Sequence, residues 1–296
     1  MLVMGEMTCI AEALVLWGEV QYAAVELRGE KYIGARASMN VWNPRGQAAD
    51  EPITSQIWLT SNDTMISLQA GWLGPCPFTQ RVAWRGTAPV KKNSTLNAPE
   101  AAPLHSMRCG EARGLHVDGY KTNCYNLNCP GFVQTNHHKI LDSILDPVSV
   151  YGGAQYEVDV QIFKDRVSKH WWVALEGDPL GYWPKELVAH MEPGSDVLAF
   201  GGEVYNSVAG GVISMPTQMG SGHVASEGFR KASFFKNVQT VDTNNFYRRP
   251  KDGEVQTLVS CSCYELQVSR DEYGPWGYNF YYGGPAPSAS CNCKPS

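Results

Sequence analysis

Alternation of apolar and polar residues from Gln155 to Lys164 is the feature that most constrains the fold. The apolar members Tyr156, Val158, Val160 and Ile162 alternate with Gln155, Glu157, Asp159 and Gln161. A period of two puts every second side chain on the same face of an extended chain, so the segment predicts a half-buried strand. Turn residues 165–169 then lead into the apolar run His170–Leu175, and we expect the two runs to form a β-hairpin.

Short apolar runs bounded by turn residues recur along the chain. Those expected to be strands are Ala37–Trp42, Ser55–Thr60, Met65–Trp72, Asp196–Tyr205 and Tyr278–Tyr282. Lys185–Met191, which follows Pro184, predicts one short helix with proline in its first turn. A chain with 29 Gly, 18 Pro and 18% charged residues favours strands and turns over helices. The expected fold class is all-β, an antiparallel two-sheet β-sandwich.

Two segments differ from this pattern. Residues 1–20 match nothing familiar and are expected to be an N-terminal stub, followed by a single domain over residues 21–296. Residues 73–114 are rich in Pro, Ala and Gly, show no sustained period and predict a long irregular insertion that interrupts the domain.

Charge and hydropathy exclude several function classes. The net charge is −5, and no basic tract is longer than two residues, so a nucleic-acid partner is not expected. No segment is long and apolar enough to span a membrane. Met1–Val20 carries Glu6 and Glu12 without a basic lead and is a poor match to a signal peptide.

Two expected strands each carry one polar side chain among small residues. By strand parity Gln69 shares a face with Ser67 and Gly71, and Glu203 shares a face with Gly201. Both polar groups would then project from faces where glycines leave room for a bound chain. Two solvated strand residues would produce the same pattern, so parity alone leaves both interpretations open.

Several ordered motifs connect the chain with a known family. They are Ser55–Trp58, Ser67–Trp72, Gly119-Tyr120, Cys124-Tyr125, Cys129–Gln134, Tyr151–Gly153, Gly181–Pro184, Phe200–Tyr205 and Thr217–His223. With these motifs the chain resembles the neprosin family, plant glutamic peptidases that cleave at proline. The resemblance covers Gln21 to Trp72 and Gly119 to Pro285, which is most of the chain.

The resemblance implies a cleft across one sheet, where two glutamate carboxyls act on water and on the scissile carbonyl. In this chain the two positions are occupied by Gln69 and Glu203, so a glutamine replaces the first of the two glutamates. Glu203 would be the general base, and the substrate a proline-containing polypeptide cleaved at acidic pH. Resemblance and parity suggest Gln56, Tyr156 and Gln218 as polar groups of the cleft. No cofactor and no metal are expected, and the protein is expected to be a monomer.

The glutamine at position 69 leaves two outcomes open, because an amide donates hydrogen bonds but cannot transfer a proton. In the first, Glu203 alone cycles as base and acid while Gln69 stabilises the oxyanion, as in the Gln/Glu dyad of the eqolisin peptidases. In the second, the substitution abolishes turnover. The rival classes are then an inactive binding module for proline-rich proteins and a sandwich that binds cell-wall carbohydrate.

Nine cysteines and two glycosylation sequons, at Asn62 and Asn93, favour an oxidising compartment, and secretion is implied by the family. The resemblance supports a Cys124–Cys129 disulfide. Cys263 is expected to pair with Cys293 or with Cys291. A zinc site made by the two Cys-x-Cys pairs is the alternative, although their spacing is unusual for zinc. The pairing of Cys9, Cys76, Cys109, Cys261 and Cys291 stays open.

Two pairs of neighbouring ring side chains are also constrained by parity. His137 and His138 are expected on a strand with their side chains on opposite faces, so they cannot chelate one metal ion together. Trp171 and Trp172 are likewise expected on opposite faces. One of the two tryptophans must therefore point outward, where an exposed ring could stack on a sugar.

Overall fold

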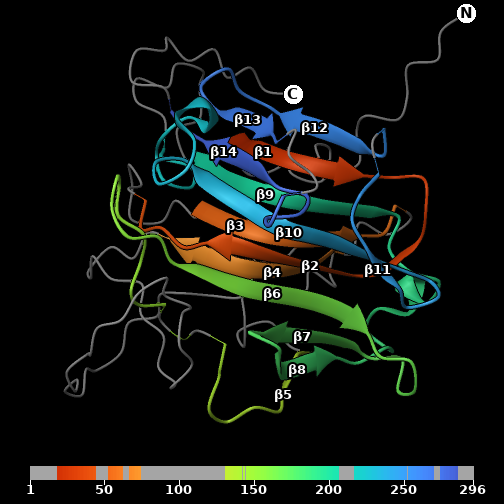
Figure 1. Ribbon diagram of the computed structural model, residues 1–296. Coiled ribbons are helices and arrows are strands. Elements are labelled where there is room, and N and C mark those ends of the chain that lie inside the picture. Colours follow the sequence, from red (N-terminus) through yellow and green to blue (C-terminus); the bar gives the residue numbers. More distant parts are fainter. Residues whose placement is uncertain are drawn as a thin grey trace, which may run out of the picture.

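The computed structural model describes residues 19–44, 53–62, 67–74, 131–141, 143, 145–206, 217–251, 253–269 and 274–285. Within these residues, fourteen strands form two antiparallel sheets that pack face to face (Figure 1). We refer to them as the five-stranded and the nine-stranded sheet. The prediction of an all-β, two-sheet antiparallel sandwich is confirmed.

Each of the two sheets takes strands from both halves of the chain. The five-stranded sheet has the order β12 (Val255–Val259), β1 (Glu19–Leu27), β9 (Val197–Asn206), β3 (Ile53–Thr60) and β4 (Ser67–Gly74). The nine-stranded sheet has the order β13 (Glu265–Val268), β14 (Phe280–Gly283), β10 (Ser233–Asp242), β2 (Tyr32–Asn40), β6 (Glu157–Lys164), β7 (Trp171–Leu175), β8 (Asp178–Trp183) and β5 (Val133–Gln134), and β11 (Tyr247–Arg248) pairs with β10.

The expected hairpin over residues 155–175 is confirmed, because β6 and β7 pair antiparallel with Phe163 opposite Trp172. In β6 the apolar side chains of the alternation point into the core and are at most 5% exposed, while the polar ones between them are partly exposed. A strand that covers the core on one side and meets water on the other needs this alternation.

The core between the sheets is dominated by aromatic rings. Phe235 on β10 stacks on Phe280 of β14, with ring centroids 5.1 Å apart and an interplanar angle of 9°. Trp72 on β4 donates its indole N–H to the backbone oxygen of Asn40 on β2, at 3.0 Å. This hydrogen bond satisfies the buried indole and joins the two sheets directly.

The short helix predicted over Lys185–Met191 is found only in its last three residues, and as a 3₁₀ helix. The described hydrogen bonds there join residues three apart, as in Leu187 N–H to Pro184 O and Met191 N–H to Val188 O. They form successive turns that end in the 3₁₀ helix η2 (Ala189–Met191). The described residues contain one further 3₁₀ helix, η3 (Ala225–Glu227). The segment leads from β8 in the nine-stranded sheet to β9 in the five-stranded sheet, and the tighter i→i+3 bonds turn the chain on this path.

The expected strand at His137-His138 is also wrong. Both residues are exposed and lie in a bend that follows the two-residue strand β5. The Asn136 side chain accepts hydrogen bonds from the backbone N–H groups of His138 and Lys139, at 2.9 Å each. Asparagine commonly stabilises a turn in this way, at the expense of an extended strand.

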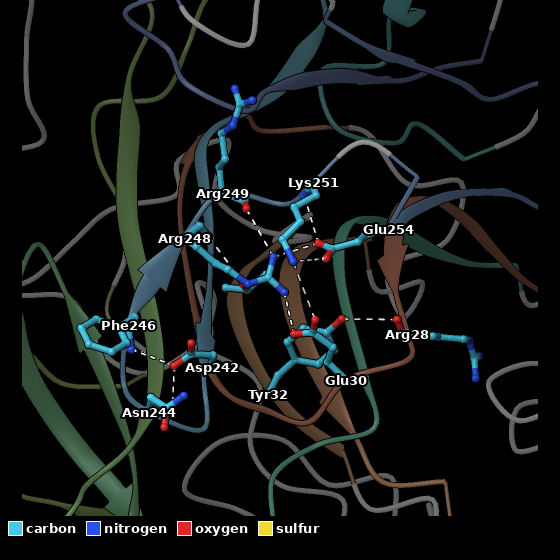
Figure 2. A network of polar contacts seen from close by, with 11 residues as sticks. Arg28, Glu30, Tyr32, Asp242, Asn244, Phe246, Arg248, Arg249, Lys251 and Glu254 are labelled. Carbon is cyan, nitrogen blue, oxygen red and sulfur yellow. Dashed lines mark hydrogen bonds and ion pairs between the residues drawn. The ribbon is translucent and has the colours of Figure 1, made fainter.

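One network of charged side chains ties the two sheets together at one end of the sandwich (Figure 2). The Arg248 network consists of Glu30, Arg248, Lys251 and Glu254. Arg248, on β11, reaches Glu30 in the β1–β2 turn at 2.7 Å and Glu254, just before β12, at 2.8 Å. Lys251 lies 3.2 Å from Glu254. The pairing holds the loop between β11 and β12 against the β1–β2 turn.

The Arg248 network also shapes the environment of Tyr32 at the start of β2. Burial, followed by the nearby carboxylates of Glu254 and Glu30, raises the pKa of the Tyr32 hydroxyl to about 12, against an opposing effect of Arg248. The hydroxyl therefore stays protonated, and it donates to the backbone oxygen of Arg28 at 3.5 Å. The phenol thus adds a neutral donor to this charged end of the sandwich.

The expectations for residues 1–18 and for nearly all of the 73–114 insertion fall outside the described residues, since β4 ends at Gly74. Among the described residues, no helix has both the length and the apolar character needed to cross a membrane.

Candidate active site

Strand β3 is buried on both faces, whereas β6 is buried on one face only. Ile53, Ile57 and Leu59 point into the core between the sheets. The opposite face, which points away from the nine-stranded sheet, carries Thr54, Gln56, Trp58 and Thr60, all at most 9% exposed. A buried face with polar side chains requires internal hydrogen bonds, and such faces are frequent at functional sites.

The strands on either side of β3 bring the two predicted catalytic positions to this polar face. In the β3–β4 ladder Gln69 lies opposite Trp58, and Gln56 lies opposite Gly71. In the β3–β9 ladder Glu203 lies opposite Thr54. Gln69 and Glu203 are therefore on strands that flank β3 and on the same face, Glu203 two positions before Gln56 along β3 and Gln69 two positions after it. Their predicted parity is confirmed.

Gln56 bridges the two flanking side chains. Its Nε2 donates to Gln69 Oε1 at 3.3 Å and to Glu203 Oε2 at 3.4 Å. The exposed fractions are 1% for Gln56, 1% for Gln69 and 6% for Glu203. The three side chains thus form one buried polar cluster, which we call the Gln–Gln–Glu site.

Gln69 is held at its other end by Ser67. The Nε2 of Gln69 donates to Ser67 Oγ at 3.1 Å, and Thr60 Oγ1 lies 3.4 Å from the same hydroxyl. Ser67 opens β4, opposite Thr60 in the ladder, and is 1% exposed. The strand ends of β3 and β4 therefore supply a hydroxyl pair that fixes the amide at position 69.

Two glycines lie beside Gln56, of which Gly71 lets β4 approach β3 closely and Gly201 lets β9 approach β1. Gly71 and Gly201 lie opposite Gln56 in the two ladders. A Cβ atom at Gly71 would lie 1.9 Å from the backbone oxygen of Ser55, and one at Gly201 would lie 2.3 Å from that of Ala23. No side chain fits at either position, so the row across the sheet at Gln56 has glycine on both sides.

Aromatic and small apolar side chains border the site. Tyr22 on β1 lies opposite Glu203, and its ring meets the Trp58 ring edge to face with centroids 6.4 Å apart. Trp58 packs with Ala24 and Ala199 in a small cluster on the same face. Glu203 therefore lies beside apolar rings, an environment of low polarity that strengthens electrostatic interactions with a bound group.

Behind the site, on the core side of β3, a buried hydrogen bond links the two sheets. The hydroxyl of Tyr282 on β14 donates to Ser55 Oγ at 2.7 Å. Burial raises the pKa of this hydroxyl well above its ordinary value, so it remains a donor. Since Ser55 precedes Gln56, the bond anchors β3 at the position that carries the bridging amide.

The chemistry of the Gln–Gln–Glu site follows from its donor and acceptor groups. Among its three side chains, only the Glu203 carboxyl can take up and release a proton, while the amides can donate and accept hydrogen bonds. The arrangement fits one general base beside amide donors that could stabilise an oxyanion. No group of three or more His, Cys, Asp or Glu side chains suited to a metal ion is found among the described residues.

The other two predicted cleft residues are on elements other than the three strands of the site. Tyr156 immediately precedes β6 in the nine-stranded sheet and is partly buried. Gln218 lies in the loop before β10, and a Cβ at Gly222 would lie 2.6 Å from its Cδ, so its side chain packs on that glycine. Their role in a cleft stays a prediction. The sequence reasoning did not single out Ser67 for this site, although Ser67 shares its parity with Gln69.

The predicted cysteine and glycosylation positions are only partly described. Cys263 is buried, and both it and Cys261 are disulfide-bonded. Cys124, Cys129 and Cys293 lie outside the described residues, so the predicted pairs stay predictions. Asn62 is exposed in the turn after β3, and Asn93 is outside the described residues.

A comparison with known families covers the part of the chain that holds Glu203. A family model described as Neprosin matches residues 114–285, which include Glu203, while Gln56 and Gln69 precede them. The match spans β5 to β14, more than half of the chain. The protein therefore belongs to the neprosin family and carries a peptidase-like domain of that family.

Proposed function

We propose that the protein is an endopeptidase in which Glu203 is the one ionisable catalytic group and Gln69 acts through its amide. The observation that carries this proposal is the Gln56 bridge, because one amide group lies within hydrogen-bond reach of both side chains. The two positions are thus kept together although one of them is glutamine. The substrate implied by the family resemblance is a proline-containing polypeptide, cleaved at acidic pH.

The proposed reaction needs only this chain's residues and one water molecule. The Glu203 carboxylate takes a proton as the water oxygen attacks the scissile carbonyl carbon, and the amide of Gln69 donates to the resulting oxyanion. Glu203 then returns the proton to the amide nitrogen as the carbon–nitrogen bond breaks. The products are a carboxylic acid and an amine, and Glu203 is again ionised.

One observation favours a second candidate, a binding module that does not cleave. The amide of Gln69 cannot take part in proton transfer, whereas a site with two carboxyls shares that work. Such a module would hold proline-rich proteins at the polar face of β3. Its carbohydrate-binding variant would use the outer face of the nine-stranded sheet, where Trp172 is partly exposed beside Tyr182 at 4.9 Å, while Trp171 is buried.

The deciding experiment measures cleavage of a quenched fluorescent proline-containing peptide from about pH 2 to pH 7. The purified protein is compared with Glu203→Gln, with Gln69→Glu, and with the exposed-site control Glu186→Gln. We expect cleavage by the native protein and by the control, and its loss in Glu203→Gln. Faster cleavage by Gln69→Glu would show that the second carboxyl is still accommodated.

Other outcomes of this experiment would replace the proposal. If the native protein is inactive and Gln69→Glu is active, the native protein is the non-cleaving module. Saturable binding of the peptide without cleavage would agree with that result, and retention on a polysaccharide column would support the carbohydrate-binding variant. Inactivity of all variants, without peptide binding, would remove the Gln–Gln–Glu site from both candidates.

The proposal includes action outside the cell as a glycosylated, disulfide-bonded plant protein and a monomer. The disulfides at Cys261 and Cys263 and the exposed position of Asn62 support this part. Peptide mapping under non-reducing conditions would locate the disulfide partners, and glycosidase treatment would lower the apparent mass if Asn62 carries a glycan. Light scattering would give the oligomeric state.

A further inference from the structure

Both the oxygen and the nitrogen of the Gln69 amide are hydrogen-bonded, and these two bonds determine which atom faces which neighbour. Gln56 donates to its oxygen at 3.3 Å, while its nitrogen donates to the Ser67 hydroxyl at 3.1 Å. The opposite orientation of the amide would place two N–H groups against each other at Gln56. The side chain at position 69 therefore has one preferred orientation, set by two partners on the same buried face.

Ser67 is the adaptable partner of the two. The amide nitrogen of Gln56 can only donate, whereas a serine hydroxyl donates one hydrogen bond and accepts others. Towards Gln69 the Ser67 hydroxyl acts as an acceptor. Towards a carboxylate at position 69 the same hydroxyl could act as a donor after rotation about its C–O bond. Thr60 donates its hydroxyl proton to Ser67 Oγ at 3.4 Å and can keep this bond, because the serine oxygen still accepts when its own proton turns towards the carboxylate.

The position of Ser67 makes this hydroxyl hard to replace. Ser67 is the first residue of β4 and is paired with Thr60 at the end of the β3–β4 ladder. It is 1% exposed, so water is a poor substitute for its hydroxyl. Its distance of two residues from Gln69 puts both side chains on one face of the strand. Neither Ser67 nor Thr60 enters the proton transfer proposed above.

We propose that Ser67 is a positioning residue that orients the side chain at position 69, whether that side chain is an amide or a carboxyl. The catalytic part of this inference rests on the proposed function, whereas the orienting part does not. Loss of the hydroxyl should leave an amide at position 69 in place but less well oriented. For a carboxylate introduced there, the loss removes a hydrogen-bond donor to the charged form, which raises the pKa of that carboxyl.

The test is a cycle of four proteins: native, Ser67→Ala, Gln69→Glu, and the double variant. The first measurement is a ¹³C NMR titration of the carboxyl group introduced by Gln69→Glu, with and without Ser67→Ala. We expect its pKa to rise by on the order of one unit when the hydroxyl is removed. Ser67→Thr keeps a hydroxyl and should restore the lower value. The control Ser61→Ala removes another buried hydroxyl, just beyond β3, and should leave the pKa unchanged.

The second measurement is peptide cleavage by the native protein and Ser67→Ala. We expect kcat to fall by roughly tenfold with little change in KM and no shift of the pH profile, because the amide at position 69 does not titrate. A fall of the same size in Ser61→Ala would attribute the loss to general destabilisation and overturn the catalytic part. Restoration by Ser67→Thr would support it.

The two measurements separate this inference from the proposed function. If the carboxyl pKa rises on Ser67→Ala but no protein cleaves peptide, Ser67 orients position 69 and the peptidase proposal fails. If peptide is cleaved and Ser67→Ala changes neither the carboxyl pKa nor kcat, the peptidase proposal stands and the role of Ser67 is overturned. If Ser67→Ala fails to fold, as judged by circular dichroism, Ser67→Cys takes its place. The thiol is a weaker hydrogen-bond donor than a hydroxyl, so the pKa of the carboxyl at position 69 should be higher in Ser67→Cys than in Ser67→Thr.

Discussion

The protein contains two buried or partly buried polar clusters that differ in the kind of contact that joins their side chains. In the Arg248 network, carboxylates and cations meet at 2.7 Å and 2.8 Å. In the Gln–Gln–Glu site, the described hydrogen bonds of Gln56 are longer, at 3.3 Å and 3.4 Å, and come from a neutral amide. One cluster joins chain segments that would otherwise separate, and the other lies within a ladder of strands that is already paired.

The difference teaches which cluster is there for stability and which for chemistry. A short contact between opposite charges lowers the free energy of the folded state but leaves no group available for a substrate. Longer amide contacts contribute less to stability, and they leave a carboxyl whose protonation can change during a reaction. We therefore expect substitutions in the site to change activity more than stability, and substitutions in the network to do the reverse.

The largest expected effect comes from Glu203→Gln. The substitution keeps the shape of the side chain and removes its proton chemistry, so peptide cleavage should fall by about 10²–10⁴-fold. The thermal unfolding temperature should stay close to that of the native protein. Differential scanning calorimetry together with the peptide assay measures both quantities. A large fall in unfolding temperature would contradict the assignment of this cluster to chemistry.

Gly71→Ala should be an exception to this rule. Position 71 lies in the Gln–Gln–Glu site, yet its substitution should lower the stability as well as the activity. Its Cβ would meet the Ser55 oxygen at 1.9 Å, so β4 must move away from β3 and carry Gln69 away from Gln56. We expect a loss of about 3 kcal/mol in the free energy of unfolding together with a loss of activity. Gly74→Ala is the matched control on the same strand, since its nearest neighbour is 3.5 Å away.

Arg248→Met should lower stability with no change in peptide cleavage per folded molecule. It removes the cation shared by Glu30 and Glu254 and leaves two carboxylates near each other. We expect a cost of about 1–2 kcal/mol, measured by urea denaturation. Arg166→Met, in the exposed turn after β6, is the control and should change neither quantity. An equal loss in both variants would show that the network contributes nothing specific.

The smallest expected effect is a pH dependence of the Arg248 network. Burial disfavours the charged form of Glu254, but the Lys251 backbone N–H and the guanidinium of Arg248 outweigh it and hold the pKa of this carboxyl below its ordinary 4.5. Its stabilisation is therefore complete above the unfolded-state pKa and is lost as the pH falls through the folded-state pKa.

Thermal unfolding of the native protein and of Glu254→Gln between about pH 6 and pH 3 tests this sign. The native protein should be the more stable at the upper end of the range, and the difference should shrink as the pH falls. A difference that is constant with pH would show that Glu254 acts through packing alone. In that outcome the stabilisation by Glu254 would persist at the acidic pH at which the proposed peptidase works.

The sequence predicted strands well where a regular period or an apolar run between turn residues marks them. The alternation in β6 is read directly from its residues, because its polar side chains meet water. Strand β10 was not predicted, since its period is interrupted: Phe234 and Phe235 are both buried, and the register to β2 shifts between Lys236 and Gln239. The segment Lys185–Met191 has the composition of a helix, yet it forms turns and the 3₁₀ helix η2 on the way from β8 in one sheet to β9 in the other.

For the candidate site, the sequence predicted which residues share a face of one strand but not which residues of different strands are in contact. Parity put Gln69 and Glu203 beside glycines, and the structure agrees. That β3 lies between β4 and β9, and that Gln56 reaches both flanking residues, depends on the strand order, which no local pattern encodes. Ser67 was missed as a contact for a different reason: it shares a face with Gln69, but a buried serine and an exposed serine look alike in a sequence.

The pairing of β3 with β9 has a consequence for the nascent chain. Gln56 and Gln69 are 13 residues apart and can meet as soon as their hairpin forms, whereas Gln56 and Glu203 are 147 residues apart. During translation the β3 edge that receives β9 must wait with its backbone unpaired while the intervening residues are made. A chain released after residue 69 and before residue 203 carries both amides and lacks the carboxylate. Under the function proposed here, a ribosome-bound or prematurely terminated chain is proteolytically silent, and the first capacity to cut peptides arises only after most of the molecule exists.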